Sequence, residues 1–348
     1  MRSIRVRHVL AAFPALATGI GGGGGEKRPT QQATVTYAAV SVGGIHTCGV
    51  TAEGAAYCWG LSKFGQLGDG TKKDRSRPVP VAGGVSFAAV SAGGIHTCGL
   101  TAAGVAYCWG RNNAGQFGDG TYNDRSRPVL VAGGLSFAAL SAGDFHTCGL
   151  TAAGTAYCWG LNDNGQLGEV ITVNGALGTM GDRKSPVSVS GGVSIAAVSA
   201  GGSGAPDRGY TCGVTAGGAA YCWGDNSAGQ LGDGTTCCDG KIPVPVVGDV
   251  SFAAVSAGGH TCAVTATGAA HCWGDNSSGQ LGDGTRTSHT GPVPVAGGVS
   301  FAALSARGIG HTCGVTATGT AHCWGDNSSG QLGDGTRTSR LTPVLVVP

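Results

Sequence analysis

After residue 36 the chain passes repeatedly through short apolar stretches separated by glycine-rich or polar ones. In the first unit the apolar stretches are residues 37–42, 46–51, 55–59 and 78–81. Runs this short, bounded by turn residues, predict β-strands. Pro78 and Pro80 fit an edge strand, because proline cannot donate a hydrogen bond to a further neighbour. The unit therefore predicts one four-stranded antiparallel sheet with a long polar loop before its last strand.

The same pattern occurs six times. The motif His-Thr-Cys-Gly-(Val/Leu)-Thr-Ala-x-Gly-x-Ala-(Tyr/His)-Cys-Trp-Gly starts, with small variations, at His46, His96, His146, Tyr210, His260 and His311. The repeats are residues 37–86, 87–136, 137–194, 195–251, 252–300 and 301–348. A period near fifty residues indicates a propeller or an array. We therefore predict an all-β fold, a β-propeller of four-stranded antiparallel blades with six recognisable repeats.

The middle hairpin of the repeat can be placed in register. Its three-residue loop, 52–54, ends in glycine, where a left-handed residue is needed. Counting outward from this loop places Cys48 opposite Cys58 in a non-hydrogen-bonded pair, with Cα atoms roughly 4.5 Å apart. That separation is at the short end of what a disulfide can span.

Twelve of the 14 cysteines share this ten-residue spacing. We predict six disulfides: Cys48–Cys58, Cys98–Cys108, Cys148–Cys158, Cys212–Cys222, Cys262–Cys272 and Cys313–Cys323. Two alternatives stay open at this stage: small buried thiols that fill the core, and a metal site formed by the cysteines with His46. Cys237 and Cys238, adjacent in a variable loop, are either a strained pair or free thiols.

The first 36 residues stand outside the repeats. A basic start is followed by an apolar stretch at 9–20, five glycines at 21–25 and a polar stretch. Residues 1–20 are typical of a secretory signal and too short for a membrane span, and 21–36 form a glycine-rich linker and partial strand. We expect a secreted or cell-envelope protein without a lipid anchor; the alternative is a cytoplasmic protein with a disordered start. No transmembrane segment is expected after residue 20.

Composition excludes some partners. Only 11% of the residues are charged, the formal net charge is +2, and 68 of 348 residues are glycine. Such a balance gives no electrostatic case for nucleic acid or an anionic surface. The glycine content fits many turns and closely approaching backbones.

The repeats resemble those of the regulator of chromosome condensation (RCC-type) family. The matching residues are Thr51-Ala-Glu-Gly54, Tyr57-Cys58-Trp59-Gly60 and Gly65-Gln-Leu-Gly-Asp-Gly-Thr71, with their counterparts in each repeat. The resemblance implies a closed propeller, usually of seven blades, so a seven-bladed type of ring is the alternative to six. It also implies two classes of function. The founding member promotes nucleotide exchange on a small nuclear GTPase, whereas bacterial relatives are binding proteins, among them an inhibitor of β-lactamases. None of the exchange factor's site residues can be placed on this sequence.

Both ends of the chain carry a candidate for the same strand. Residues 28–37 resemble residues 77–87 with one residue missing, and residues 343–348 read as a complete fourth strand. We expect residues 343–347, the more apolar candidate, to pair inside the first blade and so to close the ring.

Function is expected where the repeats differ. Three irregular segments, at 169–184, 203–209 and 236–241, fall in loops between the first and second or the third and fourth strands, which share one face of a propeller. All 16 Lys and Arg beyond residue 36, and 16 of 18 acidic residues, are assigned to these loops; the exceptions are Glu53 and Asp249. Variable loops on a rigid scaffold are the usual place for binding.

We therefore predict a non-catalytic scaffold that binds a protein or glycan partner on this face. We expect it to be a monomer and to need no cofactor or metal. Its expected contacts are Arg75, Arg77, Arg125, Arg127, Asp182, Arg183, Lys184, Asp207, Arg208, Asp239 and Lys241, with Tyr122, Phe145 and Met180 as apolar anchors. The recurring histidines are expected to be structural, and the Asp275–Asp283 loop to cap its own backbone rather than bind calcium. An enzyme would instead need a unique polar cluster near the propeller axis.

Overall fold

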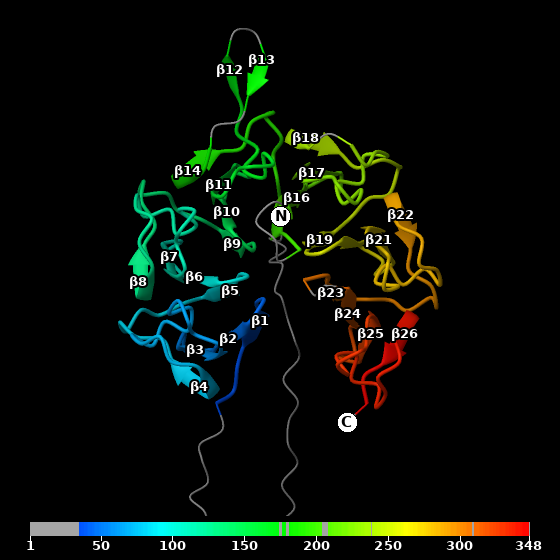
Figure 1. The fold of residues 1–348 in the computed structure, drawn as a ribbon, viewed down its shortest axis with the longest axis horizontal. Coiled ribbons are helices and arrows are strands. Elements are labelled where there is room, and N and C mark those ends of the chain that lie inside the picture. Colours follow the sequence, from blue (N-terminus) through cyan, green and yellow to red (C-terminus); the bar gives the residue numbers. More distant parts are fainter. Residues whose placement is uncertain are drawn as a thin grey trace, which may run out of the picture.

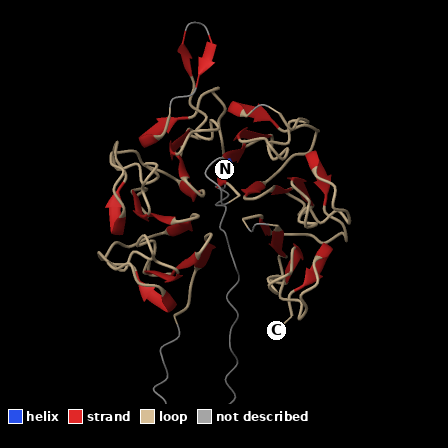
Figure 2. Ribbon diagram, in the orientation of Figure 1, coloured by secondary structure: helices blue, strands red, loops and turns tan. Residues whose placement is uncertain are grey.

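The computed structural model describes residues 35–173, 176–178, 181–203, 208–237, 239–307 and 310–347. Six four-stranded antiparallel sheets, the blades, stand around a common axis (Figure 1). A separate two-stranded sheet projects outward beyond blade 3. Strands and loops make up the described ranges, and none of these residues is in an α-helix (Figure 2). The all-β propeller predicted from the sequence is confirmed.

Each blade contains four consecutive strands, counted from the axis outward. The strands of blades 1 to 3 are β1 (Ala39–Val42), β2 (His46–Val50), β3 (Ala56–Gly60), β4 (Arg75–Pro80); β5 (Ala89–Ala92), β6 (His96–Leu100), β7 (Ala106–Gly110), β8 (Arg125–Leu130); and β9 (Ala139–Ala142), β10 (His146–Leu150), β11 (Ala156–Gly160), β14 (Arg183–Ser188). The projecting sheet consists of β12 (Ile171–Val173) and β13 (Ala176–Gly178).

Blades 4 to 6 repeat the arrangement. Their strands are β15 (Ala197–Gly201), β16 (Tyr210–Val214), β17 (Ala220–Gly224), β18 (Gly240–Pro245); β19 (Ala254–Ala257), β20 (Thr261–Val264), β21 (Ala270–Gly274), β22 (His289–Pro294); and β23 (Ala303–Ser305), β24 (His311–Val315), β25 (Ala321–Gly325), β26 (Arg340–Leu345).

The register of the middle hairpin is as predicted. Gly54 has a φ of 86° and closes the loop, and Cys48 lies opposite Cys58. The six predicted disulfides are all present, with Cα atoms 4.0 to 4.1 Å apart. These bridges leave the twelve cysteines neither free as thiols nor available to a metal. Cys237 is free and exposed, and Cys238 lies outside the described residues.

The cores of blades 1 to 5 are each completed by the next blade along the chain. Trp109 of blade 2 is fully buried against the Cys48–Cys58 disulfide, Leu67 and Phe87. Trp159 completes the core of blade 2 in the same way, next to Phe117 and Phe137. A blade therefore needs its successor to bury its own apolar side chains, which fits the rule that one repeat cannot form a core alone.

The expectation that residues 343–347 complete the first blade is wrong. Strand β26 pairs with β25 of its own blade, with Val344 opposite Cys323, and blade 1 has its own outer strand in β4. Strand β26 pairs with β25 rather than with a strand of blade 1 because the loop between β25 and β26 is short, so closing it costs less entropy. Figure 1 shows the ring open between blades 1 and 6.

Candidate binding surface

The charged residues gather at one end of the blades, but many of them lie in strands. Eight of the 16 cations beyond residue 36 belong to the outer strands β4, β8, β14, β18 and β26 rather than to loops. The assignment of all 16 to loops is therefore wrong. The reason is that the main chain resumes pairing at once after the polar loop, with Gly60 opposite Arg75.

Some of the predicted contact residues are engaged in ion pairs inside their own blade. Arg75 pairs with Asp69 at 2.7 Å, and Arg340 pairs with Asp334 at 2.8 Å. Arg183 pairs with Glu169 at 2.6 Å in the equivalent positions of blade 3. Each pair joins an acidic residue within the loop to the first residue of the outer strand. Arg75 and Arg183 therefore have a structural role, and the Arg183–Glu169 pair fixes the base of the insertion that carries β12 and β13.

Two predicted acidic contacts are caps of the same loops. A carboxylate oxygen of Asp182 accepts the main-chain N–H of Asn162 at 3.2 Å, and one of Asp239 accepts that of Asn226 at 3.4 Å. Asp74 and Asp124 do the same in blades 1 and 2. Burial raises the pKa of Asp182. These side chains hold the loop base instead of standing free for a partner.

Tyr122 and Lys184 come together on the surface from neighbouring blades. Tyr122, in the loop before β8, is 50% exposed, and the ammonium of Lys184 at the start of β14 lies 5.8 Å from the centre of its ring. Gly120 also donates its N–H to the carbonyl of Lys184 at 2.7 Å, which ties the two segments together. An exposed aromatic ring beside a lysine ammonium is a cation–π pair, and the sequence had placed both residues among the expected contacts.

A second aromatic–cation group was missed. The guanidinium of Arg111 lies 4.6 Å from the ring centre of Phe64, and the ammonium of Lys63 lies 5.7 Å from it. Phe64 belongs to blade 1 and Arg111 to blade 2, so this group also joins neighbouring blades, at repeat positions that differ from those of Tyr122 and Lys184. The signal was present in the sequence, because Phe64, like Tyr122, is an aromatic residue that the equivalent positions of the other repeats lack.

The remaining expected contacts are spread over the same end of the ring. Arg77, Arg125, Arg127, Arg208 and Lys241 are exposed. Arg127 reaches the preceding blade, where its guanidinium covers Gly70. Phe145 is half-buried, so it is a poor anchor. Asp207 and Met180 lie outside the described residues.

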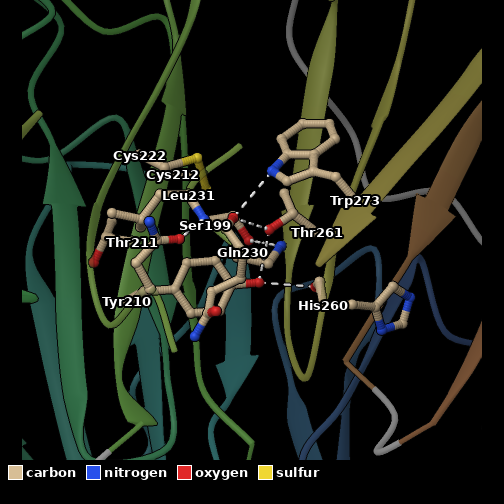
Figure 3. The surroundings of a disulfide bond; sticks show 12 residues. Ser199, Tyr210, Thr211, Cys212, Cys222, Gln230, Leu231, His260, Thr261 and Trp273 are labelled. Atoms are coloured by element: carbon tan, nitrogen blue, oxygen red, sulfur yellow. Dashed lines mark hydrogen bonds between the residues drawn. A yellow bond between two sulfur atoms is a disulfide. The ribbon is translucent and has the colours of Figure 1, made fainter. Parts of the chain in front are cut away.

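The histidines of the repeat are structural, as expected. The Nε2 atoms of His46, His96 and His146 lie 2.7 to 2.9 Å from the hydroxyls of Thr97, Thr147 and Thr211, each in the next blade. Burial lowers the pKa of His46 to about 4 and that of His96 and His146 to about 3. In blade 4 the phenol of Tyr210 takes the same role and bonds Thr261 and the carbonyl of His260 (Figure 3).

One unique polar group lies at the axis. Arg307, from the loop after β23, crosses the ring and donates to the carbonyls of Ala92 and Ala142, and at 3.5 Å to that of Ala200. Burial lowers the pKa of Arg307, while the nearby carboxylate of Asp144 raises it. The guanidinium thus holds blades 2, 3 and 4 together.

The Asp275–Asp283 loop caps its own backbone, as expected. Asp275 accepts the N–H of Ser277 at 3.1 Å, and Asn276 donates to Asp283 at 3.1 Å. In the described part of the chain, no three His, Cys, Asp or Glu side chains are grouped so as to hold a metal ion. Nor does any described segment form a helix long and apolar enough to cross a membrane.

Known proteins match this chain over the whole propeller. A family model described as the RCC1-like domain matches residues 15–348. Human WBSCR16 is 21% identical, with a TM-score of 0.77 over 91% of this chain and 83% of that one. Yeast RCC1 (Prp20) in complex with Kap60 is 20% identical, with a TM-score of 0.75 over 90% and 75%. Prp20p from Saccharomyces cerevisiae, described with its binding to Gsp1p and histones, gives 20% and 0.75 over 90% and 77%. At these identities the likeness to the solved structures shows the fold.

Proposed function

This chain belongs to the RCC1-like domain family, and from that premise we propose that it is a non-catalytic binding scaffold whose charged loop face holds a protein or glycan partner. The observation that carries the proposal is the exposed Tyr122–Lys184 pair between blades 2 and 3. Tyrosine is typical of interface hot spots. A side chain that is already held by a neighbour in the free protein has less conformational freedom to lose on binding.

The binding surface is centred on Tyr122, Arg125 and Lys184, with the β12–β13 hairpin beside it on blade 3. Ion pairs and caps hold the loop bases still, so the exposed side chains are presented in one geometry. We place the protein outside the cell or in the cell envelope. Six disulfides fit an oxidising compartment, and they disfavour the alternative role of a nucleotide exchange factor for an intracellular GTPase.

The test is a binding measurement with matched variants. A partner is captured from the native cell envelope by the full chain and its affinity is then measured. We expect Tyr122→Ala with Lys184→Ala to weaken binding more than tenfold, about 1.4 kcal/mol or more, with an unchanged melting temperature. Glu53→Ala with Asp249→Ala, on the opposite face, is the control and should change nothing.

A loop exchange tests the contribution of blade 3. Replacing residues 169–182 by the blade 2 counterpart, residues 119–124, keeps an acidic residue opposite Arg183 and removes β12 and β13. We expect a folded protein with weaker binding. Equal binding by the double alanine variant and the wild type would contradict the assigned surface. Hydrolysis of a substrate panel, or accelerated nucleotide release from a small GTPase, would contradict the scaffold itself.

A further inference from the structure

The charges of the propeller are divided unevenly between its blades. Residues 37–136, which form blades 1 and 2, contain 8 Lys and Arg against 5 Asp and Glu, a net charge of +3. Residues 137–300, which form blades 3 to 5, contain 5 against 11, a net charge of −6. The near-neutral balance of the whole chain is therefore the sum of a positive part and a negative part, and each part attracts partners of the opposite charge.

The acidic residues of the loops in blades 1 and 2 are used inside those blades. Each has a carboxylate oxygen that accepts a main-chain N–H of its own blade at 2.7 to 2.9 Å; they are Asp69, Asp74, Asp119 and Asp124. Asp69 also pairs with Arg75. The lysines and arginines that remain beside these loops therefore dominate the charge that a partner meets.

Five cations and one tyrosine form an exposed arc along the outer rim of blades 1 to 3, where Figure 1 shows β4, β8 and β14 one after another. The members of this cationic arc are Lys72, Lys73, Arg127, Arg125, Tyr122 and Lys184, and all six are exposed. Within the described ranges, none of the five cations is in a salt bridge.

Two contacts across blade boundaries connect the members of the arc. Arg127 of β8 reaches back to blade 1, where a Cβ atom at Gly70 would lie 3.0 Å from its Nη2, two residues before Lys72. Lys184 of β14 reaches back to blade 2, with its ammonium 5.8 Å from the ring centre of Tyr122. A linear ligand along the rim therefore meets cations of three blades in turn, and several weak contacts on one ligand reinforce one another.

The main chain along this rim is largely occupied. The carbonyl of Ser126 in β8 accepts the N–H of Gly70 at 2.8 Å, and the carbonyl of Lys184 accepts that of Gly120 at 2.7 Å. Pro128 has no N–H to offer. A peptide that adds to the edge of a sheet depends on main-chain hydrogen bonds, so recognition here depends on side chains.

The side chains of the arc fit a charged sugar polymer better than a nucleic acid. Double-stranded DNA carries one negative charge per about 1.7 Å, whereas the cations of the arc are interrupted by the ring of Tyr122. An acidic polysaccharide has at most one carboxylate per sugar unit, and each sugar ring has apolar C–H faces. Such a face can pack on the exposed tyrosine while carboxylates pair with the guanidinium and ammonium groups on either side.

We propose that the cationic arc binds a linear polysaccharide that carries carboxylate groups, with a sugar ring on Tyr122 and carboxylates on the lysines and arginines beside it. The inference rests on the proposed function, because it names the class of partner for the surface around Tyr122 and Lys184. It also extends that surface to Lys72 and Lys73 of blade 1.

Biolayer interferometry on the immobilised full chain tests the inference, with polygalacturonate as the probe. The methyl-esterified polymer has the same sugars without the charges, and poly-L-glutamate has the charges without the sugars. We expect only polygalacturonate to bind, with a dissociation constant that rises with salt concentration because the ion pairs are exposed.

Matched variants assign the binding to the arc. Lys72→Ala with Lys73→Ala should raise the dissociation constant about fivefold or more. Arg286→Ala with Arg337→Ala is the control, since these exposed arginines occupy the position of Lys72 in blades 5 and 6 and their removal costs the same charge. This control should bind as the wild type. Tyr122→Ala should weaken binding about fivefold, whereas Tyr122→Phe, which keeps the ring, should not.

Three results would overturn the inference: no binding of polygalacturonate by the wild type, equally tight binding of poly-L-glutamate, or an equal loss in the Arg286 and Arg337 control. The partner captured from the cell envelope judges the proposed function separately. If Tyr122→Ala with Lys184→Ala weakens binding of that partner while polygalacturonate neither binds nor competes, the surface is right and the polysaccharide is wrong. If the captured partner binds this double variant as well as the wild type, the proposed function fails whatever the polymer does.

Discussion

The indole N–H of Trp109 donates a 3.0 Å hydrogen bond to the main-chain carbonyl of Gln66 in the preceding blade. Trp159, Trp273 and Trp324 repeat the bond to Gln116, Gln230 and Gln280 at 2.9 to 3.0 Å. Figure 3 shows how Trp273 and Thr261 share the carbonyl of Gln230. Trp223 differs, because its buried indole N–H has no partner within the described residues.

This difference gives a matched pair of variants. Trp109→Phe removes a hydrogen bond and packing, whereas Trp223→Phe removes packing and a buried N–H that was unsatisfied. We expect Trp109→Phe to lower the free energy of unfolding by about 1–3 kcal/mol more than Trp223→Phe. Guanidinium denaturation of both variants under oxidising conditions measures it. Equal losses would show that the bond to Gln66 contributes nothing net.

Such bonds mark the limit of what the sequence could predict. The pairing of Cys48 with Cys58 follows from the position of Gly54 alone, because a hairpin register is local. The bond between Trp109 and Gln66 depends on the angle between two blades, and positions that are identical in all repeats carry no information about that angle. The hydrogen-bond partners of Arg307 could not be predicted for the same reason, since they depend on how far the ring curves back on itself.

Part of the candidate site could likewise be predicted from the sequence, and part could not. Tyr122, Arg125 and Lys184 could be selected as variable, exposed types in a loop-rich region. The pairing of Arg183 with Glu169 was also within reach, because Arg75 with Asp69 and Arg340 with Asp334 show the same residue types six positions apart. The insertion in blade 3 hid the relation by separating Glu169 from Arg183 in the sequence. The contact of Lys184 with Tyr122 joins two blades, and only the structure shows it.

The buried histidines predict a pH dependence of stability. His46, His96, His146 and His260 have a pKa of about 3 to 4 in the folded protein, chiefly because of burial, against about 6.5 in an unfolded chain. The unfolded chain therefore binds more protons below pH 6.5, so stability is full above that pH and falls as the pH drops. Each histidine should contribute a loss of up to about 1.4 kcal/mol per pH unit.

The measurement is the free energy of unfolding at several values between pH 7 and 5, above the range in which carboxylates titrate. Replacing one group, in His96→Gln, should lower the slope by about one proton. A stability that does not change between pH 7 and 5 would mean that these histidines can be protonated in the folded protein.

The disulfides predict a defined labelling pattern. Alkylation of the native protein without reductant should modify the exposed Cys237 and none of the twelve paired cysteines. Because each bridge closes a short loop, a Cys→Ser pair in one blade should cost about 2–3 kcal/mol. Peptide mass mapping checks the first statement and denaturation the second. Label on most of the twelve cysteines would contradict the assigned bridges.

Arg307 provides the most direct test of the ring itself. Its guanidinium is bonded to carbonyls of blades 2, 3 and 4, which are far from blade 6 in sequence. Arg307→Met keeps most of the volume and removes these bonds, leaving buried carbonyls without a donor. Since a hydrogen bond to a charged group contributes about 1.5–3 kcal/mol, we expect a loss of at least about 3 kcal/mol in the free energy of unfolding. Arg337→Met, at an exposed loop position of the same blade, is the control and should change it by less than about 0.5 kcal/mol. If both variants were equally stable, Arg307 would be a surface residue in solution, and blade 6 would be held to the others only through its contact with blade 5.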